Sequence, residues 1–407
     1  MLDNFQSLDV VRSSNVPTLL AYDSKTESLV IGEDAKLIAE MYQPVIQNFK
    51  LAIGESDPMF EGRFAASPNA KPQRLWELRH SGSNAERLLS TREATRAFLE
   101  RLFAQLKDLP EQLVIGIPAS RDRTWLSQYR NHLGGVLAEM GYGNTQFFPE
   151  PFAVFQYYRH VEGLIPQSSQ PQAVLVVDFG GGTMDSCIIE TTSEGNLSRG
   201  GTTSLPLGIQ SCIGAGKEID KRLLKCAIAK VDDAQLRHDS VEARLENRPW
   251  VLLAVERMKI ALAAKMQAAR LDEDCRHVTE TFILPVSSYH PDKAVHLELS
   301  GEDLKHVITD LWRDKLGPGA AVVATISEAK YRKGSIYLQQ LDKIIVAGGS
   351  SLLPFIRELL IKSISGQISF KPEDVLLGSA SEKAVVLAAM RKRIFPAICR
   401  RCLSGLA

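Results

Sequence analysis

The sequence lacks the features that mark several large classes of protein. It has no apolar run near the ~20 residues that a membrane-spanning helix needs, and no signal-peptide core follows Met1. It also lacks an excess of either charge, because Lys+Arg and Asp+Glu both number 48. The whole chain therefore has no net field to attract nucleic acid or anionic lipid. We expect neither a nucleic-acid partner nor a membrane partner.

Cysteine is scarce. Six cysteines are scattered over 407 residues, which does not suit the disulfide framework of a small secreted domain. We interpret them as reduced thiols and expect a cytoplasmic protein. Cys399 and Cys402 form an isolated C-x-x-C pair, whereas a zinc site needs a second pair or histidines. The composition, 44% hydrophobic and 24% charged, excludes a wholly disordered or collagen-like chain.

The most familiar nucleotide-binding motifs are also missing. The sequence contains no G-x-x-x-x-G-K-[ST], which excludes a P-loop, and no G-x-G-x-x-G opens a helix after the first strand. Asp178-Phe179-Gly180 spells the D-F-G of protein kinases. However, no H-R-D-L catalytic loop precedes it and no V-A-I-K strand is present, so the match to kinases is a coincidence of three letters.

What the sequence does contain is an alternation of strand-like and helix-like segments. "VPTLLAY" (16–22) and "LVIGIPA" (113–119) predict strands, and the apolar spacing in 91–107 predicts an amphipathic helix. The second half repeats the pattern, with a strand, a glycine turn and a helix in 343–360. The fold class is therefore α/β, with two halves and a cleft between them. The expected divisions are lobe I in 1–170, lobe II in 171–390 with an inserted subdomain at about 215–300, and a basic tail in 391–407.

One short stretch carries most of the chemistry. "VLVVDFGGGTMDSCIIE" (174–190) places three glycines between two apolar runs, with an aspartate on each side. We interpret 180–183 as the tip of a β-hairpin, whose backbone N–H groups can approach an anion closely because glycine has no side chain. Asp178 ends the first strand, where it can hold Mg²⁺ through water or accept a proton from an attacking water. The alternative is a glycine-rich hairpin that only turns the chain.

Further stretches follow a recognisable order along the chain. They are "LVIGIPASRDR", "FFPEPFAVFQYY", "VVDFGGGTMD", "GAGKEIDKRL", "VERMKIALA" and "IIVAGGSSLLPFIRELL". Together they resemble DnaK-type heat-shock chaperones of the actin-like ATPase superfamily, over about residues 16–390. The resemblance implies a bilobal actin-like fold, with ribonuclease-H-like lobes and helical/β subdomain insertions. It also implies that the ligands are ATP or ADP with Mg²⁺.

The resemblance assigns roles position by position. Lys50 corresponds to a lysine that contacts the terminal phosphate and the attacking water, and Thr183 to a threonine that contacts phosphate. Glu150 corresponds to the glutamate that orients water around Mg²⁺, and Asp178 to the catalytic carboxylate, so both would hold Mg²⁺ through water. The nucleotide-binding positions are Gly180, Gly181, Gly182, Gly216, Glu256, Lys259, Gly348, Gly349 and Ser350. Each assignment has an alternative without a functional role. Lys50 would be a solvated surface lysine, and residues 256 and 259 would form an exposed i,i+3 ion pair.

Three departures from the family pattern stand out. The family opens on a first phosphate hairpin of the type "GIDLGTT", whereas this sequence has no glycine before Gly32. We expect an incomplete lobe I, from a truncated start or a misplaced start codon; the alternative is a lobe I built differently. Losing such preorganised donors costs on the order of 10²–10³ in rate for each donor. Ile260 and Ala263 replace the arginine and serine that contact adenine in the family. We also expect a nucleotide-binding module without a peptide-binding domain.

These observations lead to three hypotheses about function. The first is a DnaK-like module that binds Mg-ATP between its lobes and hydrolyses it, with a protein partner such as a co-chaperone. The second is a nucleotide-dependent scaffold or sensor that does not hydrolyse ATP, which the missing hairpin and Ile260 favour. The third is an actin-like filament protein, whose motifs match less well.

Overall fold

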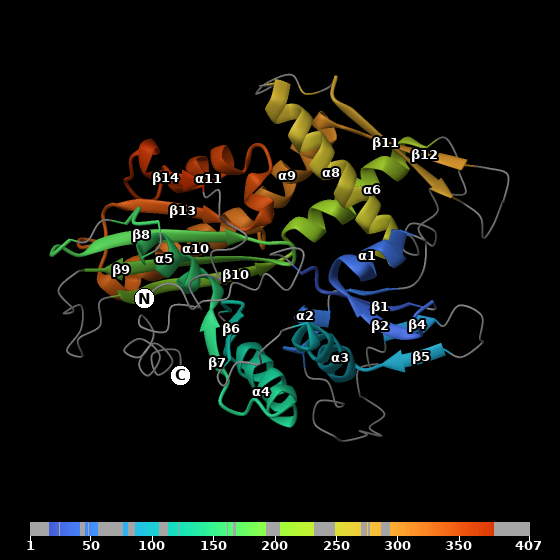
Figure 1. Ribbon diagram of the computed structural model, residues 1–407. Helices are drawn as coiled ribbons and strands as arrows, with labels where there is room; N and C mark the ends of the chain where they lie inside the picture. Colours follow the sequence, from blue (N-terminus) through green and yellow to red (C-terminus); the bar gives the residue numbers. More distant parts are fainter. Residues whose placement is uncertain are drawn as a thin grey trace, which may run out of the picture. The chain divides into compact units, whose positions relative to one another are not determined.

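The computed structural model describes most of the chain as two compact units (Figure 1). Unit 1 contains Met1–Ile115, Thr124–Phe147 and Asn247–Leu253, and unit 2 contains Gly116–Arg123, Phe148–Glu246 and Ala254–Ala407. The expected lobe boundary near residue 170 stays a prediction, because this division follows packing alone. The expected basic tail and the Cys399–Cys402 pair lie outside the described residues. The described residues are 16–23, 25–40, 45–47, 49–55, 76–79, 86–105, 113–120, 122–160, 162–165, 168–192, 204–231, 249–269, 275, 277–285 and 294–377.

Unit 1 is built on a small antiparallel sheet of order β2-β1-β3, with a β4-β5 hairpin and helices beside it. Its elements are β1 (Leu19–Asp23), β2 (Ser28–Ile31), α1 (Gly32–Glu40), β3 (Val45–Gln47), α2 (Phe49–Ala52), β4 (Trp76–Arg79), β5 (Glu86–Leu89), α3 (Thr91–Ala104) and α4 (Arg123–Glu139). Two further strands, β6 (Val114–Ile117) and β7 (Gln146–Pro149), pair where the chain passes from one unit to the other. The predicted strands at 16–22 and 113–119 are confirmed as β1 and β6.

The core of unit 1 forms where α2 and α3 meet the sheet. Phe49 and Phe98 lie with ring centroids 5.5 Å apart, next to the buried Leu20 and Ile46. The predicted amphipathic helix is confirmed as α3, although its buried face is shifted. Ala94 and Phe98 are buried, whereas Leu99 and Leu102 pack only partly against this core.

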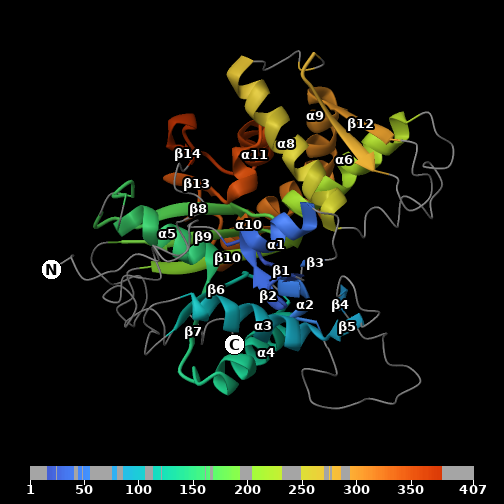
Figure 2. The ribbon, with the colours of Figure 1, turned by 45° about the vertical axis from the view of Figure 1, so that its right-hand side comes forward.

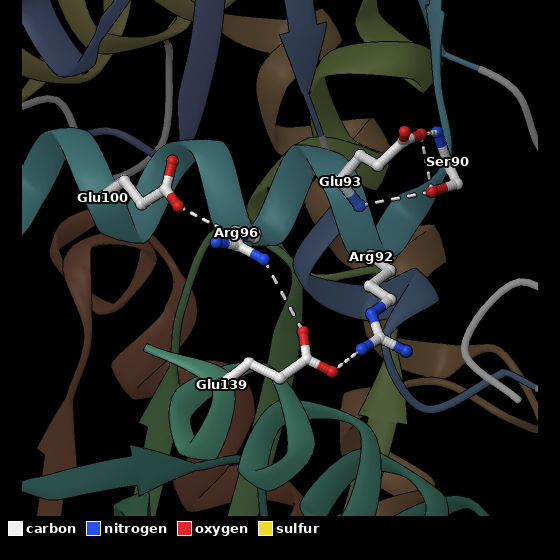
Figure 3. A network of polar contacts seen from close by, with 6 residues as sticks. All are labelled: Ser90, Arg92, Glu93, Arg96, Glu100 and Glu139. Carbon is white, nitrogen blue, oxygen red and sulfur yellow. Dashed lines mark hydrogen bonds and ion pairs between the residues drawn. The ribbon is translucent and has the colours of Figure 1, made fainter. Parts of the chain in front are cut away.

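A polar network fixes the start of α3 and ties it to α4 (Figure 3). Ser90 caps the helix, because its hydroxyl accepts the N–H of Glu93 while the Glu93 carboxylate accepts the N–H of Ser90. Arg92 and Arg96 both turn toward Glu139 at the end of α4. These charges are half exposed, so the network mainly sets the register of the two helices and adds little stability.

Unit 2 is built on a five-stranded sheet of order β10-β9-β8-β13-β14 (Figure 2). β8 (Gln172–Phe179), β9 (Thr183–Thr191) and β10 (Ser204–Ile213) form an antiparallel meander. β13 (Lys343–Ala347) and β14 (Val375–Leu377) then add in parallel on the β8 side. Residues 174–177 and 344–347 are fully buried, which explains why β8 and β13 are continuous apolar runs.

Helices cover both faces of this sheet. The guanidinium of Arg159 in α5 (Glu150–His160) donates to the hydroxyl of Thr191. The hydroxyl of Thr325 in α10 (Pro318–Lys333) lies 2.6 Å from that of Ser186. Residues 186 and 191 are an odd number of positions apart on β9, so α5 and α10 lie on opposite faces.

The long helix α8 begins in unit 1 and continues in unit 2. Its apolar residues Leu252, Val255, Met258 and Leu262 recur at helical spacing and are buried. Ser300 and Asp303, at capping-box spacing, do form a reciprocal cap. Within the described part of the chain, no helix is both long and apolar enough to cross a membrane. The remaining elements are α6 (Gly216–Lys230), α8 (Pro249–Ala269), β11 (Thr279–Pro285), β12 (Ala294–Ser300), α9 (Gly301–Arg313), the short 3₁₀ helices Gly349–Leu352 and Pro372–Asp374, and α11 (Ile356–Ile364).

The close packing of α10 on β10 gives a first prediction. A Cβ atom added at Gly208 would lie 2.4 Å from the carbonyl oxygen of Thr325. We therefore expect Gly208→Ala to lower the free energy of unfolding by about 1–3 kcal/mol, measured by denaturant titration. Gly135→Ala on α4 is the control, because no atom lies within 4 Å of its added Cβ, and alanine favours a helix. Equal stability of Gly208→Ala and the wild type would contradict this packing.

Candidate functional site

The predicted glycine hairpin is confirmed as the connection between β8 and β9. Gly180, Gly181 and Gly182 form its tip, and the N–H of Gly180 donates to the carbonyl of Thr183 at 3.0 Å. Asp178 and Asp185 are direct partners across the two strands. Directly paired residues point to the same face of a sheet, so the two carboxylates lie on one side of the hairpin.

The carbonyl groups of the tip are all bound within unit 2. They accept backbone N–H groups from the segment that begins α6: Gly216 to Gly180 at 3.2 Å, Lys217 to Gly181 at 2.7 Å and Gly214 to Gly182 at 3.0 Å. These bonds join the tip to the start of α6 residue by residue. The glycine-bearing "GAG" segment is thus placed beside "GGG", as expected for two parts of one site.

The N–H groups of the tip are disposed differently. In the part of the chain that the structure describes, the backbone N–H groups of Gly181 and Gly182 have no protein acceptor. Gly181 is exposed and Gly182 half exposed, so an outside anion can reach these donors. Two adjacent glycine N–H groups without an internal partner form a small anion-binding concavity.

The third glycine turn, after β13, closes on the same tip. Gly348 has a φ of +86°, and a Cβ there would lie 2.4 Å from the carbonyl oxygen of Phe179. The hydroxyl of Ser350, the residue after Gly349, donates to the carbonyl of Gly180 at 2.8 Å. A Cβ added at Gly216 would lie 2.4 Å from that hydroxyl oxygen. The structure therefore brings together the predicted nucleotide-binding positions of all three turns.

Acidic groups gather next to the tip. Asp185 is only 1% exposed, and its Oδ2 accepts the hydroxyl of Thr183 at 3.0 Å. Burial, followed by the nearby charge of Glu150 and then that of Asp178, holds the pKa of Asp185 well above its usual range. Glu150 is the first residue of α5 and half buried, as is Asp178 at the end of β8. The candidate site residues did not include Asp185, although its pairing opposite Asp178 follows from a two-strand hairpin with this tip.

The donor set suits a hard cation. Carboxylate and hydroxyl oxygens are the ligands that Mg²⁺ prefers, and Asp185 Oδ1 is buried with no hydrogen-bond partner in the structure. Among the described residues, no three His, Cys, Asp or Glu side chains are close enough to hold a metal directly. Mg²⁺ keeps several waters in most protein sites, so contact through water fits these residues.

The remaining candidate residues lie in different places. Lys50 is on α2 of unit 1, so its approach to the terminal phosphate stays a prediction. Glu256 is half buried on α8, whereas Lys259 is 5% exposed. Lys259 pairs with Asp220, at 2.7 Å, so the alternative of an exposed ion pair between 256 and 259 does not hold for Lys259. The predicted contact of Glu256 and Lys259 with the nucleoside stays a prediction. Ile260, on the same helix, is 57% exposed.

The turn at Gly348 gives a second prediction. Alanine there would meet both an unfavourable φ and the carbonyl oxygen of Phe179, so we expect Gly348→Ala to lower the free energy of unfolding by about 1–3 kcal/mol. Gly366→Ala is the control, since no atom lies within 4 Å of its added Cβ. Thermal and denaturant unfolding measure both. A Gly348→Ala variant as stable as Gly366→Ala would contradict the described turn.

The chain is similar in sequence to proteins named as DnaK or 70 kDa heat shock-related proteins. The chain is 28% identical over 237 residues to a chaperone protein dnaK from Cyanophora paradoxa, covering 55% of this chain and 32% of that protein. It is 26% identical over 224 residues to a stromal 70 kDa heat shock-related protein, chloroplastic, from Spinacia oleracea, covering 53% and 32%. It is 25% identical over 230 residues to a chaperone protein DnaK from Thermoplasma volcanium, covering 54% and 32%. The aligned part spans about a third of the length of these relatives.

A family model described as Hsp70 protein matches residues 162–392. This range takes in the glycine hairpin, the start of α6, the helix that carries Glu256 and Lys259, and the turn after β13. The match covers more than half of the 407 residues. The chain belongs to the Hsp70 family and has its bilobal actin-like α/β fold.

Proposed function

We propose that this chain is a DnaK-like nucleotide-binding module that binds ATP with Mg²⁺ and hydrolyses the terminal phosphate. One observation carries the proposal: the tip of the glycine hairpin directs its bound carbonyls into unit 2 and leaves the N–H groups of Gly181 and Gly182 without a protein acceptor. A phosphate group is the natural acceptor for such donors.

In this proposal each of the three glycine turns contacts a different part of the nucleotide. The hairpin tip binds the phosphates, and Thr183 adds a hydroxyl beside them. Gly216 and the Gly348–Ser350 turn face the nucleoside, with Glu256 reaching it from α8. Close approach of backbone to ligand requires residues without side chains, which is our explanation for the glycine at position 181 of the tip.

The carboxylates would carry the hydrolytic step. Asp178 accepts the proton of the attacking water, and Glu150 orients water on the same side of the hairpin. Lys50, from unit 1, contacts the terminal phosphate. When bound, Mg²⁺ neutralises charge on the phosphate oxygens. Because Asp185 is buried and close enough to Glu150 and Asp178 for their charges to raise its pKa, a cation would relieve this repulsion, and we include Asp185 with them in the group that would hold Mg²⁺ through water.

A second function has one specific observation in its favour. Ile260, which is 57% exposed, and Ala263, which is buried, both have apolar side chains. Neither supplies the donor that the family uses on adenine. A module that binds nucleotide weakly and does not hydrolyse it would act as a scaffold or sensor for a protein partner. The main proposal also includes a protein partner such as a co-chaperone. It further includes a cytoplasmic location. The filament hypothesis has no such support.

The catalytic role of Asp178 gives the third prediction. We expect Asp178→Asn to lower the rate of ATP hydrolysis by about 10²–10⁴-fold, because the amide cannot accept the proton of water. ATP affinity, measured by calorimetry, should change much less. Asp310→Asn on α9 is the control, an exposed aspartate that should leave turnover unchanged.

The same measurements separate the two functions. ATP binding without turnover in the wild type would favour the scaffold or sensor. Failure of the wild type to bind ATP in the presence of Mg²⁺ would contradict both. Turnover that Asp178→Asn leaves intact would contradict the role of Asp178.

A further inference from the structure

The ammonium group of Lys259 is enclosed within unit 2. Its side chain is 7% exposed, and its Nζ lies 2.7 Å from Oδ1 of Asp220, whose side chain is 5% exposed. The same Nζ donates to the carbonyl of Gly216 at 3.3 Å. A lysine with two acceptors in a buried position is held in one place. In this arrangement its charge serves contacts within the protein.

Both acceptors of Lys259 belong to the beginning of α6. Gly216 is the first residue of this helix, and Asp220 lies four residues later, one turn further along the same face. Lys259 lies on α8, so the pair connects α8 to the first turn of α6. Lys265, two turns further along α8, instead pairs with Glu280 near the surface and is 54% exposed.

The first turn of α6 is also the part that holds the glycine hairpin. The N–H of Gly216 donates to the carbonyl of Gly180, and the N–H of Lys217 donates to the carbonyl of Gly181. A shift of this turn would move those carbonyls and, through the planar peptide groups, the N–H groups of Gly181 and Gly182. Lys259 is therefore linked to the proposed phosphate donors through Gly216 and through Asp220 on the same helix.

We infer that Lys259 and Asp220 act together as a positioning pair, which holds the start of α6 against the glycine hairpin and so orients the Gly181 and Gly182 N–H groups toward phosphate. The inference rests on the proposed function. It differs from the role that resemblance gives to Lys259, which is direct contact with the nucleoside. The two roles affect different parts of the ligand, so they can be separated by experiment.

The charges around Asp220 define how the pair responds to pH. The pKa of Asp220 is raised to about 6. Burial raises it most, the charges of Lys259 and Lys217 lower it, and that of Glu256 raises it. Below this pH the carboxyl becomes neutral and the ion pair is lost. An Asp220→Asn variant has lost the pair at every pH.

The test compares two ligands, ATP and inorganic tripolyphosphate, in the presence of Mg²⁺. We expect Lys259→Met to weaken the binding of both by about tenfold, the equivalent of one weakened hydrogen bond to a charged group. Loss of ATP affinity with unchanged tripolyphosphate affinity would overturn the inference, because it indicates a nucleoside contact. Lys265→Met is the matched control on the same helix and should bind both ligands like the wild type.

A second variant keeps the test valid if Lys259→Met folds poorly. Lys259→Met leaves Asp220 buried without its partner, whereas the double variant Asp220→Asn/Lys259→Met removes both charges. We expect the double variant to bind both ligands about as weakly as the single variants, since the residues act as one unit. A double variant that binds tripolyphosphate like the wild type would overturn the inference.

The pH profile provides a readout that a merely structural role would not change. The ratio of wild-type to Asp220→Asn affinity for tripolyphosphate should be about ten at pH 8 and approach one below pH ~6, because the wild type then loses the same charge. A ratio that stays constant from pH 5 to 8 would contradict a positioning role. A wild type that binds neither ligand would overturn the proposed function and this inference together.

Discussion

The carbonyl oxygens of Gly180, Gly181 and Gly182 all accept hydrogen bonds from the segment that begins α6, and this arrangement decides which side of the hairpin keeps available N–H groups. A peptide group is planar, so fixing the direction of a carbonyl also fixes the direction of the adjoining N–H. The proposed phosphate site thus depends on contacts made on the opposite side of the tip. Ser350 strengthens this anchoring, since its hydroxyl donates to the same carbonyl of Gly180 as the Gly216 N–H.

The sheet explains why such distant segments meet. β13 runs parallel to β8 with Ala347 paired to Asp178, so both strands end at the same edge. The turn after β13 is therefore placed beside the turn after β8, and both glycine segments face one edge of one sheet. Antiparallel pairing of β9 with β10 then brings Ile213, and the start of α6 behind it, to Thr183 at the same edge. Topology alone accounts for the convergence of three turns separated by up to about 170 residues.

Much of this arrangement was readable from the sequence because it depends on local pattern. The apolar runs flanking 180–182 predicted the hairpin, and the apolar spacing in 91–107 predicted the helix α3. The partners of buried charges were harder to predict. The i,i+3 spacing placed Glu256 and Lys259 on one helical face but did not identify the partner of Lys259, which is Asp220 on another helix. The burial of Asp185 likewise depends on α5 covering one face of the sheet, which no periodicity within 174–190 records.

The glycines of the three turns also differ in how much room the protein leaves for a side chain at each position. At Gly348 an added methyl group would overlap the backbone of Phe179, and at Gly216 it would displace the hydroxyl of Ser350 from the carbonyl of Gly180. At Gly181 no protein atom lies within 4 Å of where that methyl group would stand. An alanine at this position would not clash with the protein, and its methyl group would meet only a ligand bound to the backbone of the tip. Packing within the protein therefore explains the glycine at position 348, whereas it gives no reason for the glycine at position 181.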